Sequence, residues 1–419
     1  MSPKDAHGAI DAVWRIESPR LIAGLARMVR DVGLAEDLAQ DALVAALERW
    51  PETGVPENPG AWLMATAKNR AIDMLRRRSL AERKHEEIGS TAETGGTVEE
   101  KLVAAIDDDI GDDLLRLVFT ACHPVLSKEA RVALTLRLLG GLTTDEIARA
   151  FLVPEATVAQ RIVRAKRALA DADVPFEVPR GPELADRLAS VLEVVYLVFN
   201  EGYVATAGDD LMRPALCEEA LRLGRILAEL APREPEVHGL VALMEIQASR
   251  AAARVGPSGE PVLLLDQDRA LWDRMLIGRG LAALERAWKL GNDDNDQGPY
   301  VLQAAIAACH ARARTAEETD WAKIATLYDE LGRRVPSPVV QLNRAVAVGM
   351  ASGPADALDI VDSLGAEPSL AGYHLLSSVR GDLLFKLGRF EEARAEFERA
   401  ATLTRNARER KLLTERAAA

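Results

Sequence analysis

Residues 142–169, LTTDEIARAFLVPEATVAQRIVRAKRAL, carry the strongest local structural signal in the chain. Thr143 followed by Glu146 forms a capping box, in which the threonine hydroxyl accepts a backbone N–H bond and the glutamate reaches back. Pro154 stands where the first residue of a second helix tolerates proline. That second helix carries apolar residues at i, i+4, i+7 and i+11, a pattern that predicts a buried stripe: Val158, Ile162, Ala165 and Leu169.

The other side of this second helix carries residues that can donate to base edges and phosphates. They are Thr157, Gln160, Arg161, Arg164 and Arg167. A short capped helix, a tight turn and a basic amphipathic helix are typical of a helix-turn-helix whose second helix contacts DNA. The alternative is an ordinary helical hairpin with a solvated basic face, and the turn lacks the glycine often found there.

Composition favours helix and several domains. The chain has 419 residues, of which 48% are apolar and 4% aromatic, so two to three domains are expected. Alanine, leucine, arginine and glutamate dominate, which favours helix over sheet. No apolar run approaches the roughly 20 residues of a membrane span, and the N-terminus lacks a signal-peptide pattern. We therefore expect a soluble, cytoplasmic, all-α protein that makes no membrane contact.

The distribution of charge is more informative than its sum. The net charge of −13 argues against nucleic-acid binding for the chain as a whole. Between Lys68 and Lys84, however, seven basic residues stand against two acidic ones, and the stretch from Arg161 to Arg167 adds four basic residues without an acid. These two patches are the candidate nucleic-acid-binding segments.

Loop-forming segments divide the chain. A Pro/Gly/Asn-rich stretch at 51–59 interrupts the first helices, a Gly/Thr/Glu-rich stretch follows residue 80, and prolines recur from 174 to 182. We expect an N-terminal helical domain at 1–80, a flexible linker at 81–112, a helix-turn-helix domain at 113–175 and a helical domain at 180–419.

No catalytic, metal or cofactor site is expected. Cys122-His123 and Cys309-His310 are neighbours in sequence, and neighbours on a helix do not face one another. The segment 292–298 resembles a calcium loop but lacks the bidentate glutamate, so a polar turn is the better interpretation. The acidic run at 107–109 is interpreted as solvated linker. We expect a protein that is not an enzyme.

Two N-terminal stretches bear a family resemblance. Residues 33–51, GLAEDLAQDALVAALERWP, resemble conserved region 2.2 of bacterial sigma factors, and residues 58–78, NPGAWLMATAKNRAIDMLRRR, resemble regions 2.3 and 2.4. The helix-turn-helix falls where region 4 lies, with no region 3 between. This order resembles the extracytoplasmic-function (ECF) group of sigma factors.

The resemblance implies a partner for the acidic side of the 33–51 helix. In the family this helix binds the arginine-rich β′ clamp helices of core RNA polymerase, and region 4 meets the β flap. A row of carboxylates suits such a partner; the matching residues are Asp37, Gln40, Asp41 and Glu48. A solvated acidic face is the alternative. Leu43, Leu47 and Trp50 are expected to form the buried stripe of this helix.

The resemblance also implies promoter contacts at the −10 element. A loop that captures an unstacked base of the non-template strand and a basic helix that follows the phosphates would open DNA without hydrolysis. The implied residues are Glu57, Asn58, Lys68, Asn69, Arg70, Asp73, Arg76 and Arg77. Trp62 is either a stacking platform or, as is more common at such a position, a core residue.

The C-terminal region resembles helical repeats. Residues 380–400, RGDLLFKLGRFEEARAEFERA, resemble a tetratricopeptide (TPR) repeat, whose small and large positions match Gly381, Leu384, Gly388, Phe390, Ala393, Phe397 and Ala400. In that motif the small residues let two antiparallel helices approach, and the large ones are buried in the gap between repeats. Sigma factors with such an extension form a subgroup, which the phrase 196–203, YLVFNEGY, also resembles. Asn200, Glu201 and Tyr203 either contact the sigma domains or form a buried helix end.

The resulting hypothesis is an all-α sigma factor with a region 2 domain, a region 4 helix-turn-helix domain and a TPR-like helical domain. It binds core RNA polymerase and promoter DNA, recognises the −35 element chiefly through Gln160, Arg161 and Arg164, and opens the −10 element. The C-terminal domain would regulate this by contacting either a regulatory protein or the sigma domains. The alternative is a helix-turn-helix regulator with a TPR-like interaction domain that does not act as a sigma subunit.

Overall fold

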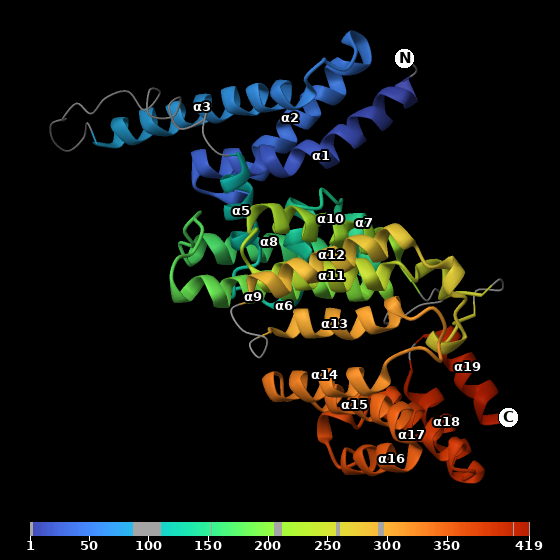
Figure 1. Cartoon of the computed structure of the whole chain (residues 1–419). Helices are drawn as coiled ribbons and strands as arrows, with labels where there is room; N and C mark the ends of the chain where they lie inside the picture. Colours follow the sequence, from blue (N-terminus) through green and yellow to red (C-terminus); the bar gives the residue numbers. More distant parts are fainter. Residues whose placement is uncertain are drawn as a thin grey trace. The chain divides into compact units, whose positions relative to one another are not determined.

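The computed structural model describes residues 3–86, 110–151, 153–204, 212–256, 260–291, 297–404 and 406–418. The chain divides into two compact units, Met1–Val194 (unit 1) and Val195–Ala419 (unit 2). Within the described ranges the regular structure is helical, apart from one isolated antiparallel bridge between Val255 and Pro261 (Figure 1). The all-α prediction is confirmed. Most of the expected linker, residues 87–109, lies outside the described ranges.

Three helices that pack on one another form the N-terminal part of unit 1 (Figure 1). They are α1 (Pro3–Val29), α2 (Val32–Thr53) and α3 (Pro59–Glu86). Side-chain caps define where two of them begin, because each satisfies a backbone N–H that has no partner inside the helix. The Asp31 carboxylate accepts from Leu34 N at 3.0 Å, and Asn58 Oδ1 accepts from Ala61 N at 3.0 Å.

The buried face of α2 is made mainly of alanine, and this corrects the predicted stripe. Trp50 is buried as expected, but Leu43 and Leu47 are only half-buried. Small residues let α1 and α3 approach the α2 backbone closely, so the line of contact follows the alanines and the leucines flank it. The buried alanines of α2 are Ala35, Ala39, Ala42, Ala45 and Ala46.

The predicted break after α2 also begins later than expected. Pro51 lies in the last turn of α2 rather than in the loop. The helix ends at Gly54, whose φ of 82° is readily adopted only by glycine and whose N–H still donates to Trp50 O at 2.9 Å. The connecting loop is therefore only 54–58, and its last residue already caps α3.

The described residues between 110 and 194 form five helical segments of unit 1. They are α5 (Ile110–Ala121), α6 (Lys128–Leu138), α7 (Thr144–Phe151), α8 (Glu155–Asp171) and the first part of α9 (Pro182–Tyr203). Two side chains of α9 satisfy carbonyls at the C-terminal end of α5: Arg187 donates to Phe119 O at 3.0 Å, and Ser190 donates to Cys122 O at 2.6 Å. These bonds join the first part of α9 to α5 within unit 1.

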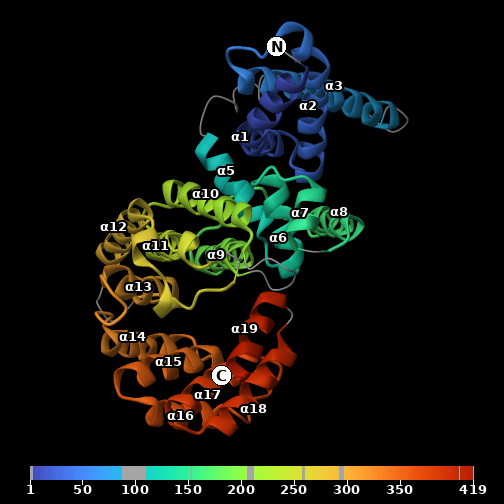
Figure 2. The same ribbon diagram turned by 90° about the vertical axis from the view of Figure 1, so that its right-hand side faces the viewer.

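Unit 2 is a succession of helices in which sequence neighbours pack together (Figure 2). They are α10 (Pro214–Leu230), α11 (Pro235–Ala248), α12 (Arg274–Leu290), α13 (Pro299–Arg312), α14 (Trp321–Arg334), α15 (Pro338–Ala351), α16 (Pro354–Ser363), α17 (His374–Lys386), α18 (Phe390–Leu403) and α19 (Ala407–Ala418), with short 3₁₀ turns at Ala251–Ala253, Leu264–Asp266, Arg269–Leu271 and Pro368–Leu370. Many of these helices start with proline, whose missing N–H costs nothing at that position. One apolar core includes Trp272 and Leu302, and a second includes Leu342 and Phe397.

The TPR-like phrase forms the packed pair α17 and α18. Gly381, Leu384, Ala393, Phe397 and Ala400 are buried as predicted. A Cβ atom at Gly381 would lie 2.9 Å from Phe397 Cε1, so only glycine allows this approach, and Gly388 makes the turn with φ 76°. The expected buried role of Phe390 is wrong. It is 60% exposed and meets Phe385 edge-on, with ring centres 5.2 Å apart.

The phrase 196–203 forms a buried helix end inside unit 2. Tyr203 is buried, accepts from Arg250 at 2.7 Å, and has the Arg254 guanidinium 3.6 Å from its ring centre. Glu201 is also buried and pairs with Arg213. These contacts favour the buried helix end over an outward-facing polar contact.

None of the helices in the described part of the chain combines the length and apolar character needed to cross a membrane.

Two glycines of α12 give a matched test of this packing. A Cβ at Gly280 would lie 2.6 Å from Ile246 Cγ1 and 3.1 Å from Ala242 O, whereas a Cβ at Gly278 meets nothing within 4 Å. We expect Gly280→Ala to lower the free energy of unfolding of unit 2 by about 1–3 kcal/mol through overpacking. Gly278→Ala should raise it by about 0.5–1 kcal/mol, because alanine favours helix.

Urea denaturation, with hydrogen exchange of α11 and α12 peptides to localise the effect, measures both changes. Equal effects of the two substitutions would contradict the close approach of α11 and α12 at Gly280.

Candidate nucleic-acid interface

The helix-turn-helix has the predicted capping geometry. Thr143 N donates to Glu146 Oε2 at 2.8 Å, and Glu146 N donates to Thr143 Oγ1 at 3.1 Å, so the capping box is confirmed. Pro154 differs from the prediction by one position. It is the N-cap residue of α8, with φ −58° and ψ 141°, rather than its first helical residue.

The predicted stripe of α8 is the side that the structure buries. Its buried residues are the four that the spacing indicated: Val158, Ile162, Ala165 and Leu169. On the other side Gln160, Arg164 and Arg167 are exposed, while Thr157 and Arg161 are half-buried. Arg167 lies 3.5 Å from Asp171, and both side chains are largely in solvent. The geometry thus leaves a polar and basic surface on α8 that can meet a DNA groove.

The acidic side of α2 is partly engaged within the chain. Asp37, Asp41 and Glu48 are exposed, whereas Gln40 is half-buried and donates to Glu36 at 2.7 Å. Asp41 Oδ2 lies 3.3 Å from Arg70 of α3. Asp41, which is implied in polymerase binding, is therefore paired with Arg70, which is implied in DNA binding. Because both side chains are exposed, this ion pair is weak and can exchange for other partners.

The implied −10 residues lie on α3 and the loop before it. Glu57, Asn58, Asn69, Arg70, Asp73, Arg76 and Arg77 are exposed, and Lys68 is half-buried. Arg76 lies 3.9 Å from Asp73. Trp62 packs edge-on against buried Trp50, with ring centres 5.3 Å apart, which favours the core interpretation of Trp62 over a stacking platform.

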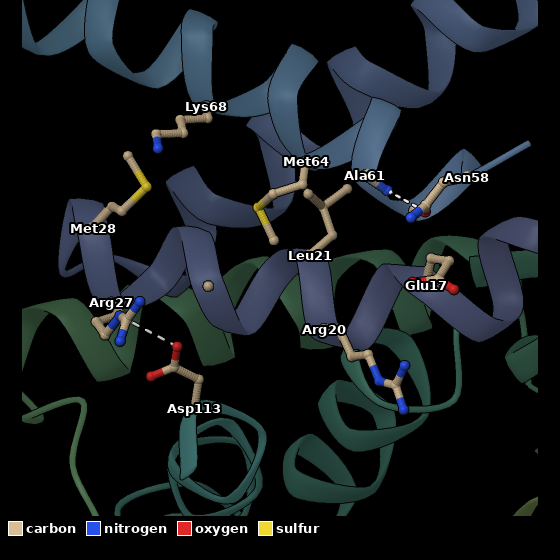
Figure 3. Close-up of a pocket in the computed structure, with 12 residues that line it drawn as sticks. Glu17, Arg20, Leu21, Arg27, Met28, Asn58, Ala61, Met64, Lys68 and Asp113 are labelled. Atoms are coloured by element: carbon tan, nitrogen blue, oxygen red, sulfur yellow. Dashed lines mark hydrogen bonds and ion pairs between the residues drawn. The ribbon is translucent and has the colours of Figure 1, made fainter. Parts of the chain in front are cut away.

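A pocket of about 440 Å³ lies between α1 and α3 (Figure 3). Leu21, Met28 and Met64 give it an apolar lining, and Asn58 and Lys68 also line it. Two residues assigned to DNA contact thus line one cavity, although the cap of α3 occupies Asn58 Oδ1.

The α1 side of the pocket carries charges that the sequence interpretation did not single out. They are Glu17, Arg20 and Arg27. A Cβ at Gly60 would lie 2.5 Å from Glu17 Oε2, so glycine is needed for this carboxylate to approach the N-terminus of α3. Arg27 Nε pairs at 3.2 Å with Asp113, the residue that α5 contributes to the pocket (Figure 3).

The structure also reveals a buried carboxylate, Glu36 of α2, only 3% exposed. Arg137 Nε of α6 lies 2.6 Å from Glu36 Oε1, and Lys166 Nζ of α8 lies 2.5 Å from Oε2. Burial raises the pKa of Glu36, but Lys166 and Arg137 outweigh burial and hold that pKa below its ordinary value. No sequence pattern indicated this contact, because Arg137 lies 101 residues from Glu36.

Burial disfavours the thiolate form of the cysteine in both cysteine–histidine pairs. Burial raises the pKa of Cys122 to about 11, and its Sγ lies 3.3 Å from Thr135 Oγ1. Burial likewise raises the pKa of Cys309, and burial together with Arg250 and Arg269 lowers the pKa of His310 to about 4. Within the described ranges no cluster of three metal-ligating side chains occurs. Residues 107–109 and 292–296 lie outside those ranges.

Comparisons with known proteins match both parts of the candidate interface. Residues 14–80 match the family model of sigma-70 region 2, and residues 116–169 match that of sigma-70 region 4. Residues 187–288 match a family of unknown function, DUF6596. Uncharacterized protein R00370 of Rhizobium meliloti (strain 1021) is 45% identical over 404 residues, which cover 96% of this chain and 93% of that protein. The chain belongs to the same family as R00370.

A more distant relative carries a functional name. The probable ECF RNA polymerase sigma factor SigI of Mycobacterium tuberculosis is 26% identical over 172 residues, in both the H37Rv and CDC 1551 strains. The match covers 41% of this chain and 58% of SigI. Together with the two sigma-70 regions, it supports a sigma factor role for this family member.

Proposed function

We propose that the chain is an ECF-type sigma factor that binds core RNA polymerase, recognises promoter DNA and helps to open it. The observation that carries the proposal is the presence of sigma-70 regions 2 and 4 in one compact unit. Sigma-70 families are not enzymes, which agrees with the non-enzymatic role. We also propose that the protein acts in the cytoplasm and that it makes the following contacts.

The proposed contacts follow from the exposed charges of unit 1. Asp37, Gln40, Asp41 and Glu48 of α2 would bind the β′ clamp helices. Region 4 would meet the β flap and contact the −35 element through exposed Gln160 and Arg164, with Thr157, Arg161 and Arg167 beside them. The loop before α3 and its basic face would take the −10 strand, through Glu57, Asn58, Lys68, Asn69, Arg70, Asp73, Arg76 and Arg77.

Unit 2 is proposed as a regulatory domain. Its packed helices form a TPR-like array, an architecture that offers extended surfaces for protein partners. Membership of the subgroup with a TPR-like extension belongs to this proposal, because residues 187–288 match a family of unknown function. The proposed domain limits are 1–80, 81–112, 113–175 and 180–419, and helix α3 itself runs to Glu86.

The test of the function is run-off transcription. The full chain, added to core polymerase with its own candidate promoters at moderate salt, should produce promoter-dependent transcripts that core alone does not. Duplex binding without a complex with core would favour the alternative, a helix-turn-helix regulator that is not a sigma subunit. Absence of both transcript and core complex would overturn the sigma assignment.

Charge reversal on α2 tests the polymerase contact. Asp37→Lys with Asp41→Lys should weaken core binding about tenfold or more, because two exposed carboxylates would be lost opposite a basic partner. Binding of an isolated −35 duplex should stay the same. Glu52→Lys, an exposed position on the same helix, is the matched control and should bind core normally. A parallel loss of core and duplex binding would contradict the division of roles.

Substitutions on α8 test the −35 contact. Gln160→Ala and Arg164→Ala should each weaken binding to the −35 duplex by about 1–3 kcal/mol if they contact base edges, and relax specificity at one position. Arg180→Ala, an exposed arginine outside α8, serves as the control. Titrations at several salt concentrations separate base contacts from phosphate contacts. Unchanged binding in both α8 variants would show that this face does not meet DNA.

A further inference from the structure

Three arginines of unit 2 lie together around two aromatic rings. The Arg254 guanidinium lies 3.6 Å from the centre of the Tyr203 ring, and Arg250 donates to the Tyr203 hydroxyl at 2.7 Å. The guanidiniums of Arg250 and Arg269 lie 5.8 and 4.8 Å from the centre of the Trp272 ring. All five residues fall in the segment that matches the family of unknown function, and that match gives the cluster no role.

Arg269 has a structural role in this cluster. It is buried, and it donates to the carbonyls of His310 and Ala313 at 2.6 and 2.7 Å and to the Thr319 hydroxyl at 3.2 Å. These bonds satisfy carbonyls at the C-terminal end of α13, which have no partner inside the helix. Hydrogen bonding within the chain therefore accounts for Arg269, in contrast to its two neighbours.

Arg250 and Arg254 lack partners of opposite charge. Arg250 donates to neutral groups, the Tyr203 hydroxyl and the Gln247 side chain. In the part of the chain that the structure describes, neither guanidinium forms an ion pair, and Arg250 Nε and Arg254 Nη1 are buried without an acceptor. The indole N–H of Trp272, a residue only 3% exposed, also lacks one. Buried N–H groups are normally paired, so these three donors suit an acceptor that the chain itself does not supply.

The positive charges of the cluster also act on one another. Burial and the charge of Arg250 lower the pKa of Arg254 and the pKa of Arg269. Burial together with Arg250 and Arg269 lowers the pKa of His310 to about 4, so this histidine is neutral at pH 7. The arginines keep their protons. Unbalanced positive charge beside unpaired N–H donors is a combination that favours an anion.

The charges and donors of the cluster favour phosphate among the common anions. Two guanidiniums without a counter-charge, those of Arg250 and Arg254, match a phosphate group, which carries about −1.5 to −2 charges at pH 7 and several acceptor oxygens. A carboxylate has only a single charge. Tyr203 and Trp272 are buried, so neither ring has a free face on which a nucleobase could stack. The cluster is therefore suited to phosphate oxygens rather than to a base.

We propose that Arg250, Arg254 and Trp272 form a phosphate-binding site in unit 2, which takes inorganic phosphate or the phosphate group of a small metabolite. Both arginines are half-buried, so an anion can reach them from solvent. Bound phosphate accepts from their N–H groups and offsets the repulsion between them. It thereby stabilises the turn that follows α11 against the end of α9, where Tyr203 lies. The inference goes beyond the proposed sigma function and does not depend on it.

Equilibrium dialysis of the full chain with radiolabelled inorganic phosphate tests the site. At constant ionic strength we expect saturable binding that chloride and acetate do not displace. Arg250→Gln and Arg254→Gln should each weaken this binding about tenfold or more, because each removes a cationic donor. Arg233→Gln, the same substitution at an exposed arginine of unit 2, should leave it unchanged. Competition by glycerol phosphate distinguishes the two sources of the group: tighter binding than inorganic phosphate indicates a metabolite, and equal or weaker binding indicates the free ion.

Two conservative variants separate loss of the site from loss of the fold. Arg254→Lys keeps the charge but not the planar fork of donors, and Trp272→Phe keeps an aromatic ring but not the indole N–H. Each should weaken phosphate binding about threefold or more, while circular dichroism shows the same helical content. Phosphate should also slow hydrogen exchange of residues 249–256 in the unmodified chain but not in Arg254→Lys. A general stabilising effect of phosphate would act equally on both proteins.

Two results would overturn the phosphate site. One is the absence of saturable phosphate binding to the folded, unmodified chain. The other is equal binding by folded Arg254→Lys, Trp272→Phe and Arg233→Gln. Neither result bears on the sigma assignment, because that assignment rests on unit 1 and is decided by transcription.

Discussion

The arrangement of unit 1 depends on a carboxylate that cannot be buried alone. Glu36 is almost fully enclosed, and two cations from helices far along the chain compensate its charge. Removing one partner of such a buried group typically costs about 3–5 kcal/mol. The α2 backbone, positioned by its alanine face and by the Asp31 cap, must therefore meet α6 and α8 in one register.

The exposed charges of unit 1 behave differently from this buried carboxylate. The net charge is −13, yet α3 and α8 carry exposed basic residues, among them Arg70, Arg76 and Arg164. Acidic side chains nearby, such as Asp41 beside Arg70, form exposed pairs of little energy. At low cost in free energy, Arg70 can exchange Asp41 for a phosphate, and Asp41 can exchange Arg70 for a basic protein partner. The buried Glu36 differs, since its partners are released only when the helices separate.

Features that depend on local sequence were predictable. The Thr143–Glu146 capping box and the four-residue stripe of α8 are encoded within a few turns of helix, and the structure has both. The small residue at Gly381 likewise matched a close approach of two helices. The regions assigned from resemblance agree with the matches at 14–80 and 116–169.

Features that depend on distant partners were not predictable. The buried face of α2 was misjudged, because alanines rather than Leu43 and Leu47 face the neighbouring helices. The attachment of α9 to α5 was not indicated by any sequence pattern, since Arg187 and Ser190 donate to carbonyls that lie 68 residues before them. Footprinting on the chain's own candidate promoters tests the central claim most directly. We predict that the full chain and core polymerase together protect both the −35 and −10 elements; a complex with core that protects neither element would contradict the account.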